Sequence, residues 1–267
     1  MLKKSSIIML LFIVYVSTAT AQRNELGVQV GAANYNGDLN PGPLNLKFLH
    51  PGFGVFYRFN KSKFVAYKLG VYYGWISGDD AKSKDSFQLQ RNLSFFSHVL
   101  DFSGEIEFNF FPFVPGTPET YFTPYIFGGF TIFQFNPTAN LGSTNYALEP
   151  LQTEGGGYGR VAAALPFGGG FKLSLTQVIN IGYELGVRRT YTSHLDDVSG
   201  VYPDPSTLSS PAAVALSNRS NQPSEELIGK QRGNGNEDWY MFTGFWITFN
   251  VFKIGKHSCE AFPHFRY

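Results

Sequence analysis

Alternating apolar and polar residues along this chain predict eight β-strands. In each segment apolar side chains stand at every second position, the period of a strand whose two faces meet different environments. In the fourth segment, Phe102 and Ile106 alternate with Glu105 and Glu107. The fifth carries aromatic residues on both faces, so its register stays open. The segments are expected near residues 25–34, 52–59, 64–75, 98–111, 121–135, 167–175, 179–188 and 239–252.

The links between these segments alternate between long and short, which is the layout of an outer-membrane barrel. We therefore predict an all-β fold, an eight-stranded antiparallel up-and-down transmembrane β-barrel with four long outer loops and short periplasmic turns. An even number of strands places both termini on the short-turn side, which is periplasmic in such barrels. The predicted short turns are 60–63, 112–120 and 176–177, and the long loops are 35–51, 76–97, 136–165 and 192–238.

A soluble β-sandwich would show similar alternation, so the length and charge of the strands decide between the two. Most of the segments reach the roughly 9–11 residues that a tilted strand needs to cross a bilayer. Their predicted outward faces are nearly free of charge, and the charged residues fall on the opposite face. We therefore predict a buried lumen charge network of ion pairs, with no open channel. Its members are Arg58, Lys68, Glu105, Glu107, Lys172, Glu184 and Arg188.

The N-terminus has the pattern of an export signal. Lys3 and Lys4 precede an apolar stretch at 7–16, and small residues end at Ala21, so cleavage is expected before Gln22. A membrane anchor is the alternative, but the apolar stretch is shorter than the roughly 20 residues that span a bilayer. The expected organisation is a cleaved signal peptide at 1–21, an outer-membrane barrel at 22–252 and a periplasmic tail at 253–267.

The composition agrees with a membrane barrel in the outer membrane. Aromatic residues make up 17% of the 267 residues and charged residues only 15%, as lipid-facing bands and interfacial girdles require. The net charge of +1 indicates no nucleic-acid partner, because such a partner needs a clustered basic face. Outer-membrane lipid is the expected surrounding. The single cysteine, Cys259, excludes an internal disulfide.

The candidate catalytic residues are weak, so we expect that the protein is not an enzyme. Glu105 and Glu107 share a strand face, but basic residues on the same face are available as counter-charges. Ser97 and His98 could belong to a lipid-modifying hydrolase, yet adjacent strand residues point to opposite faces. The glycine-rich stretch 155–159 lacks the Lys and Ser/Thr of a phosphate-binding loop.

Candidates for metal binding are equally weak, and we expect no cofactor. His257, Cys259 and His264 lie close together in the tail without a recognised ligand spacing. Asp196 and Asp197 are too few for a calcium site by themselves.

Three motifs stand out: 34–40 ends the first predicted strand, 194–200 opens the last long loop, and 231–234 with 237–242 leads into the last strand. Together they resemble the PorG-like family of small outer-membrane barrels associated with the type IX protein secretion system. The resemblance extends over the mature chain and implies a non-enzymatic barrel that contacts the periplasmic ring subunits of the secretion machine. It implies no catalytic or ligand residues. The motif residues singled out are Gly37, Asp38, His194, Asp196, Asp197, Arg232, Asp238 and Trp239.

Three functions therefore remain to be distinguished. The first is an accessory or anchoring component of a type IX secretion machine, whose basic tail at 253–267 is expected to help dock a periplasmic partner. The second is a surface-binding or adhesive barrel that acts through its long outer loops. The third is a lipid-modifying enzyme that uses Ser97 and His98.

Overall fold

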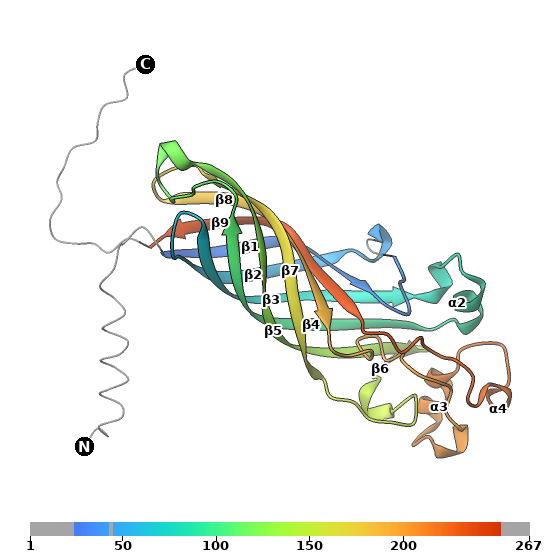
Figure 1. The fold of residues 1–267 in the computed structure, drawn as a ribbon. Helices are drawn as coiled ribbons and strands as arrows, with labels where there is room; N and C mark the ends of the chain where they lie inside the picture. The colour runs from blue at the N-terminus through green and yellow to red at the C-terminus, as the bar shows by residue number, and fades with distance from the viewer. Residues whose placement is uncertain (1–23, 43–44, 252–267) are drawn as a thin grey trace, which may run out of the picture.

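The computed structural model of the protein describes residues 24–42 and 45–251 (Figure 1). In these residues eight strands pair antiparallel with their neighbours along the chain, and β1 pairs with β9 to close the barrel. The predicted fold class is therefore confirmed. A short extra strand, β6, pairs with the far end of β5. The strands are β1 (Asn24–Asn36), β2 (His50–Asn60), β3 (Val65–Asp79), β4 (Ser94–Asn109), β5 (Phe122–Leu141), β6 (Thr144–Ala147), β7 (Val161–Ser174), β8 (Ile179–Thr190) and β9 (Trp239–Asn250).

Several strands extend further at the long-loop end than the alternating pattern predicted. β3 continues to Asp79 and β5 to Leu141, while β7 begins at Val161. Near this end the outward positions of the strands are polar, as at Ser77 and Asn140. The backbone ladder continues there although the apolar alternation has stopped. The predicted loops 76–97 and 136–165 were consequently too long.

The register of β5, which the sequence left open, is settled by the structure. Tyr125, Phe127 and Phe133 point into the barrel and are buried, whereas Ile126 and Ile132 are about half exposed on the outside. The inward aromatic rings lie beside buried basic side chains. The Nζ atom of Lys68, for example, is 4.8 Å from the ring centroid of Phe127. Period-two reasoning could not find this arrangement, since aromatic residues occupy both faces.

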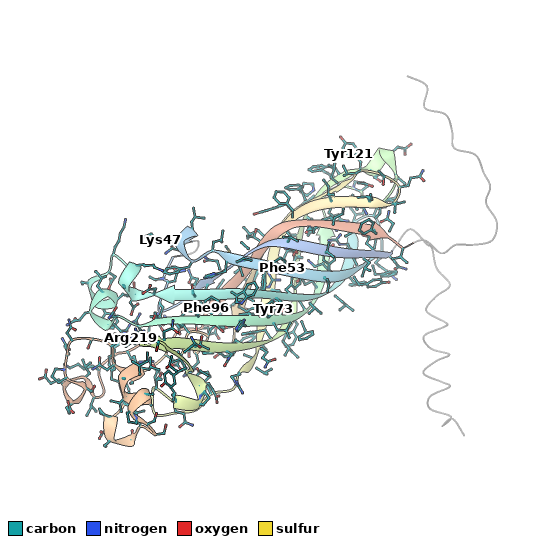
Figure 2. The ribbon with its side chains drawn as sticks, turned by 180° about the vertical axis from the view of Figure 1, so that it is seen from behind. Lys47, Phe53, Tyr73, Phe96, Tyr121 and Arg219 are labelled. Carbon is teal, nitrogen blue, oxygen red and sulfur yellow. The ribbon has the colours of Figure 1, made fainter. Side chains whose placement is uncertain are left out.

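The outer surface of the barrel is an apolar belt. Leu69, Ile106 and Phe245 are 64%, 57% and 69% exposed, and Phe53 and Tyr73 also lie on outward faces (Figure 2). A contiguous apolar surface of this extent is not stable in water and fits the hydrocarbon region of a bilayer. The structure is therefore that of a transmembrane barrel. Among the helices in the described residues, none has both the length and the apolar character needed to cross a membrane.

The connections at the long-loop end contain short helices rather than extended irregular chain. In the second loop, for example, the Asp85 side chain accepts hydrogen bonds from the first turn of α2. The helical segments at this end are η2 (Leu46–Phe48), η3 (Asp80–Lys82), α2 (Ser86–Arg91), η5 (Glu149–Leu151), η6 (Pro205–Thr207), α3 (Pro211–Ser217) and α4 (Ser224–Leu227).

The short-turn end of the barrel is covered by the turn that joins β4 to β5. This turn contains η4 (Pro118–Thr120), and its Phe113 side chain is only 1% exposed. The backbone N–H of Phe113 donates to the carbonyl oxygen of Lys63, and Lys172 Nζ lies 5.8 Å from the Phe113 ring centroid. The 112–120 connection is therefore short, as predicted, and also packs over the barrel mouth.

Candidate functional site

The seven charged residues predicted for the lumen all lie on inward strand faces and are nearly inaccessible to solvent. Lys68 of β3 lies between two carboxylates, with Nζ 2.7 Å from Glu105 Oε2 and 2.5 Å from Glu184 Oε2. The hydroxyl of Tyr125 donates a second hydrogen bond to Glu184, at 2.7 Å. Such partners are required because an unpaired buried charge is strongly destabilising.

A second group of ion pairs surrounds Arg58. Its Nη1 atom lies 3.2 Å from Glu25 Oε2, and its Nε atom lies 2.8 Å from Glu107 Oε2. Lys172 Nζ approaches the same Glu107 oxygen at 2.5 Å. The Arg58 guanidinium also lies 4.5 Å from the ring centroid of Trp246. Strands far apart in the sequence are thus joined through the barrel interior.

The third group lies nearer the long loops. Arg188 Nε is 3.1 Å from Asp101 Oδ2, which also accepts a hydrogen bond from the Tyr240 hydroxyl at 3.0 Å. The sequence-based network omitted Asp101 and Glu25. In their predicted strands both stand at the alternate positions that point inward. The alternation of apolar and polar residues could therefore have identified them.

These contacts form a network of buried ion pairs. Glu105 and Glu107 share one strand face, as predicted, but each is paired with a basic side chain. In the described residues the interior contains four basic groups and five carboxylates. They are Arg58, Lys68, Lys172 and Arg188, with Glu25, Asp101, Glu105, Glu107 and Glu184.

Ser97 and His98 do not form a catalytic pair. The Ser97 hydroxyl points inward, donates to the His98 carbonyl oxygen at 3.1 Å and accepts from the N–H of Asn136. The His98 ring lies outside the barrel, where Nδ1 is 2.8 Å from the Tyr73 hydroxyl. The two side chains therefore occupy opposite faces of β4.

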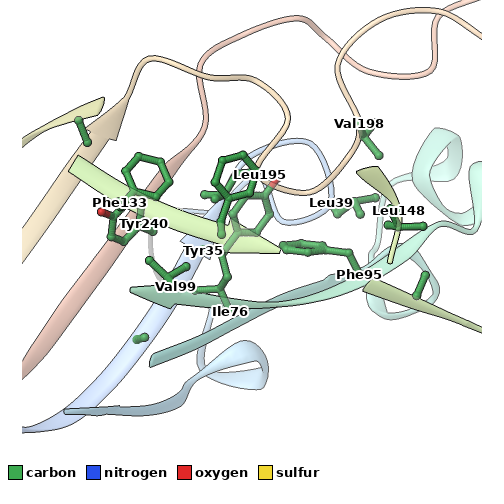
Figure 3. Packing of buried hydrophobic residues seen from close by; sticks show 14 of the residues in the cluster. Tyr35, Leu39, Ile76, Phe95, Val99, Phe133, Leu148, Leu195, Val198 and Tyr240 are labelled. Carbon is green, nitrogen blue, oxygen red and sulfur yellow. The ribbon is translucent and has the colours of Figure 1, made fainter. Parts of the chain in front are cut away.

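The long loops fold together into a single structure, here called the cap, at one end of the barrel. It comprises residues 37–42, 45–49, 80–93, 142–160 and 191–238. An apolar core joins it to the barrel, in which Leu39, Leu148 and Leu195 from three loops pack near Tyr35 and Phe95 from the strands (Figure 3). The centroids of the Tyr35 and Phe95 rings are 4.8 Å apart.

Arg91 links three of the loops. Its side chain is buried and forms two hydrogen bonds to the Asp80 carboxylate, at 2.8 and 2.9 Å. It also donates to the carbonyl oxygen of Asp38 in the first loop, at 2.8 Å, and to that of Arg232 in the fourth, at 2.6 Å. One side chain thus orients three separate segments of backbone.

Arg232 makes a second set of such links. Its Nη1 atom donates to Glu154 Oε1 of the third loop at 2.8 Å and to the Asp197 carbonyl oxygen at 2.6 Å. Its Nε atom donates to the Ser217 carbonyl oxygen at 3.1 Å. Glu154 in turn accepts hydrogen bonds from the backbone N–H groups of Ser199 and Gly200. The third and fourth loops are therefore joined by a buried charge.

Tyr35 lies between two acidic motif residues. Its hydroxyl donates to Asp196 Oδ2 and lies 3.2 Å from Asp238 Oδ1. The other oxygens of these carboxyls accept from the backbone N–H groups of Val198 and Leu195. A tyrosine hydroxyl has one hydrogen to donate, so a hydrogen bond to both carboxyls requires a proton on one of them.

Gly37 is the residue that permits this close packing. A Cβ atom at this position would collide with Asp238 Oδ1 and with the Tyr35 hydroxyl. The next residue, Asp38, accepts from the backbone N–H of Asn234 through both carboxylate oxygens. The first motif therefore contacts the third directly.

Asp197 and His194 complete the group. Asp197 has a positive φ of 68° and accepts hydrogen bonds from Thr153 and, at 2.7 Å, from Tyr158. The His194 ring stacks on Tyr158, with centroids 4.7 Å apart, while Trp239 points outward from the start of β9 against Phe167. Both carboxylate oxygens of Asp197 therefore accept hydrogen bonds within the cap.

Burial shifts the acidic groups of the cap toward their neutral forms. Desolvation raises the pKa of Asp196 to about 8 and the pKa values of Asp38 and Asp197 to about 6. It also raises the pKa of Asp238 well above its usual range, with the Asp196 charge adding to the effect. In the described part of the chain no group of three or more His, Cys, Asp or Glu side chains is arranged to bind a metal ion.

The motif residues thus converge, although they come from three separate stretches. All except Trp239 take part in contacts within the cap or between the cap and Tyr35 of β1. Sequence reasoning missed Arg91, Asp80 and Glu154, which have no motif of their own. The predicted signal cleavage between Ala21 and Gln22, the tail 253–267 and its His257, Cys259 and His264 lie outside the described residues.

Comparison with known families gives an assignment at this point. Residues 4–261 match the family described as "Domain of unknown function (DUF6089)". The chain belongs to this family. The match includes the barrel strands and all the loop segments that form the cap. No curated protein sequence matches the chain.

Three solved structures are similar to this member of the DUF6089 family at low sequence identity. The N-terminal β-barrel domain of Pseudomonas aeruginosa OprF has 12% sequence identity and a TM-score of 0.38, and the match covers 85% of this chain and 97% of that one. The attachment invasion locus protein Ail of Yersinia pestis, in complex with the heparin analogue sucrose octasulfate, has 9% identity and a TM-score of 0.42, with coverage of 85% and 97%. Neisserial surface protein A has 6% identity and a TM-score of 0.43, with coverage of 88% and 99%.

Proposed function

We propose that the protein is a non-enzymatic outer-membrane barrel that serves as an accessory or anchoring component of a type IX secretion machine and contacts its periplasmic ring. The observation that carries this proposal is the barrel interior, where buried ion pairs join opposite strands. Together with the cap and the Phe113 turn, they make a rigid body rather than a conduit for solutes.

The orientation follows from the lengths of the connections. Short turns are periplasmic in outer-membrane barrels, so the short-turn end with Asn24 and Asn250 faces the periplasm. The cap then faces outward, and the apolar belt contacts outer-membrane lipid. On this basis both termini are periplasmic, and we assign contact with the periplasmic ring to the tail 253–267.

The secretion role itself rests on the resemblance of the loop motifs to the PorG-like family. Because these motif residues are mostly buried in the cap, their role in the proposal is to fold the outer end of the barrel. Contact with the ring is assigned to the periplasmic side. Deletion of 258–267 should release the ring subunits while the barrel still inserts. Unchanged binding of the ring subunits would remove the tail from the proposal.

The secretion role is tested by a clean gene deletion followed by analysis of proteins in the medium and on the cell surface. Loss of many exported cargoes, restored by the intact gene, supports the proposal. Normal export after deletion contradicts it and favours another role for the barrel. Two variants then show which end of the barrel export depends on. Phe113→Ala alters the short-turn end and should reduce export, whereas Phe87→Ser alters the cap surface and should leave export unchanged.

A surface-binding or adhesive function is the second candidate, favoured by apolar residues on the cap. Phe87 and Leu89 of α2 are 43% and 48% exposed, and Val201 and Ile228 are exposed as well. The double variant Phe87→Ser/Leu89→Ser should abolish adhesion without affecting export if this candidate is correct. Trimming all of 192–238 is unsuitable as a test, because it would remove buried residues such as Arg232.

A further inference from the structure

One part of the belt, near the long-loop end, has an apolar groove of about 370 Å³. It opens on the outward faces of β1, β9, β8 and β7, and Asn34, Met241, Val187 and Phe167 are among its lining residues. The strand register places these four residues side by side in one row across the four strands. The volume is within the range of small-molecule sites, roughly 300–1,000 Å³.

The side chains of this row are sheltered although they point outward. Met241 is only 7% exposed and Asn34 only 1%, whereas Phe245, also outward on β9, is 69% exposed. Asn34 is covered by the first loop, because its amide donates to the carbonyl oxygens of Asn45 and Phe48 at 3.0 and 3.1 Å. The groove therefore differs from the convex surface of the remaining belt.

The rows above and below the groove indicate its direction. Above it lies the row containing Trp239 and Arg189, and the exposed Arg189 guanidinium is 2.7 Å from Glu237. A tryptophan beside charged groups marks the membrane interface. Below it the register places Ala32, Thr243, Leu185 and Gly169 in the next row, and none of these four lines the groove. The groove therefore lies at the interface end of the belt.

We propose that this groove is a specific binding site for one hydrocarbon chain of a membrane lipid whose headgroup lies at the level of Arg189. Trp239 packs edge-on against Phe167, with ring centroids 6.0 Å apart, and forms the upper wall. The site is continuous with a surface that already faces hydrocarbon, which is why a lipid chain rather than a peptide is its occupant. The inference depends on membrane insertion and not on the secretion role.

The variant Val187→Trp fills the groove, and Val55→Trp makes the same substitution at a site on β2 that is 54% exposed on the belt. Protein extracted from its own membrane in mild detergent is examined by native mass spectrometry after detergent exchange. We expect one retained lipid per barrel in the wild type and in Val55→Trp, and at least a fivefold loss in Val187→Trp. Heat-dependent electrophoretic mobility verifies that each barrel is folded.

A second variant, Met241→Phe, tests the same site if Val187→Trp does not fold. Reincubation of delipidated protein with phosphatidylcholine vesicles should restore one phosphatidylcholine adduct in the wild type and in Val55→Trp but not in the groove variants. The mass of the adduct retained from the native membrane identifies the headgroup of the native lipid. Equal lipid retention in all folded variants, or adducts of detergent mass only, would overturn the proposal. Loss of export in a deletion strain bears on the secretion role and leaves this result unaffected.

Discussion

Arg91 donates a hydrogen bond from Nη1 to the carbonyl oxygen of Arg232, 2.6 Å away and 141 residues later in the chain. This contact joins the second and fourth long loops through a side chain that is almost completely buried. The same guanidinium neutralises Asp80. Arg91 therefore determines whether the cap is one ordered body or a set of independent loops.

The variant Arg91→Met is expected to open the cap without unfolding the barrel. It leaves Asp80 buried without its counter-charge, a change that costs about 3–5 kcal/mol in comparable buried pairs. Limited proteolysis should cut residues 80–93 and 191–238, while the heat-dependent mobility of the barrel stays normal. The matched control is Arg160→Met, because Arg160 is exposed and lies 3.6 Å from a half-buried Glu149. This control should change stability by about 1 kcal/mol at most. Equal protease resistance in both variants would contradict this role.

The lumen network predicts a rescue experiment. Arg188→Met removes the basic partner of Asp101 and should lower the free energy of unfolding by about 3–5 kcal/mol. Adding Asp101→Asn removes the uncompensated charge and keeps an acceptor for the Tyr240 hydroxyl, so most of the loss should be recovered. Urea unfolding in lipid vesicles measures the free energy of unfolding of the single and the double variant. A double variant no more stable than Arg188→Met would show that the ion pair is not the source of the effect.

Glycine at position 37 is predicted to be a steric requirement. Gly37→Ala places a methyl group against Asp238 and the Tyr35 hydroxyl, and overpacking of this kind costs about 1–3 kcal/mol. Hydrogen exchange should increase in the segments 37–42 and 191–238. Gly42→Ala in the same loop is the control, because no atom lies within 4 Å of its added Cβ. Similar exchange in the two variants would refute the steric argument.

Cap stability should fall as the pH rises. Burial raises the pKa of Asp196 to about 8 and those of Asp38 and Asp197 to about 6, so the folded cap binds protons more tightly than the unfolded chain. The contribution of these neutral carboxyl groups to the stability of the cap is complete below a pH of about 4, the ordinary pKa of an aspartate. It is lost as the pH rises through 6 to 8. Burial lowers the pKa of His194, which opposes this trend only at the acidic end.

Amide exchange in the cap, corrected for its intrinsic pH dependence, measures this effect. We expect opening to be at least about tenfold more frequent at pH 8.5 than at pH 5.5, since one pKa unit corresponds to a factor of ten. Asp196→Asn has no proton to lose and should flatten the dependence. A wild-type opening frequency that does not change with pH, or that increases toward acidic pH, would contradict the assignment of buried neutral carboxyls.

The sequence by itself determined the barrel and the inward charges. Burial in a strand repeats every second residue, so Glu105, Glu107 and Lys172 could be placed inside from their neighbours alone. The same rule applied to Glu25 and Asp101, although the predicted network omitted them. It failed for β5, where aromatic residues on both faces removed the contrast between inside and outside.

The partners of those charges, and the entire cap, were decided by the tertiary structure. Tyr35 and Asp196 are 161 residues apart, and Arg91 and Arg232 have no local pattern that would pair them. Loop backbones follow no fixed period, and their polar groups are satisfied by whichever segments the closed barrel brings to the same rim. Local alternation therefore predicts which face a strand residue occupies, while contacts between loops depend on the arrangement of all four in space.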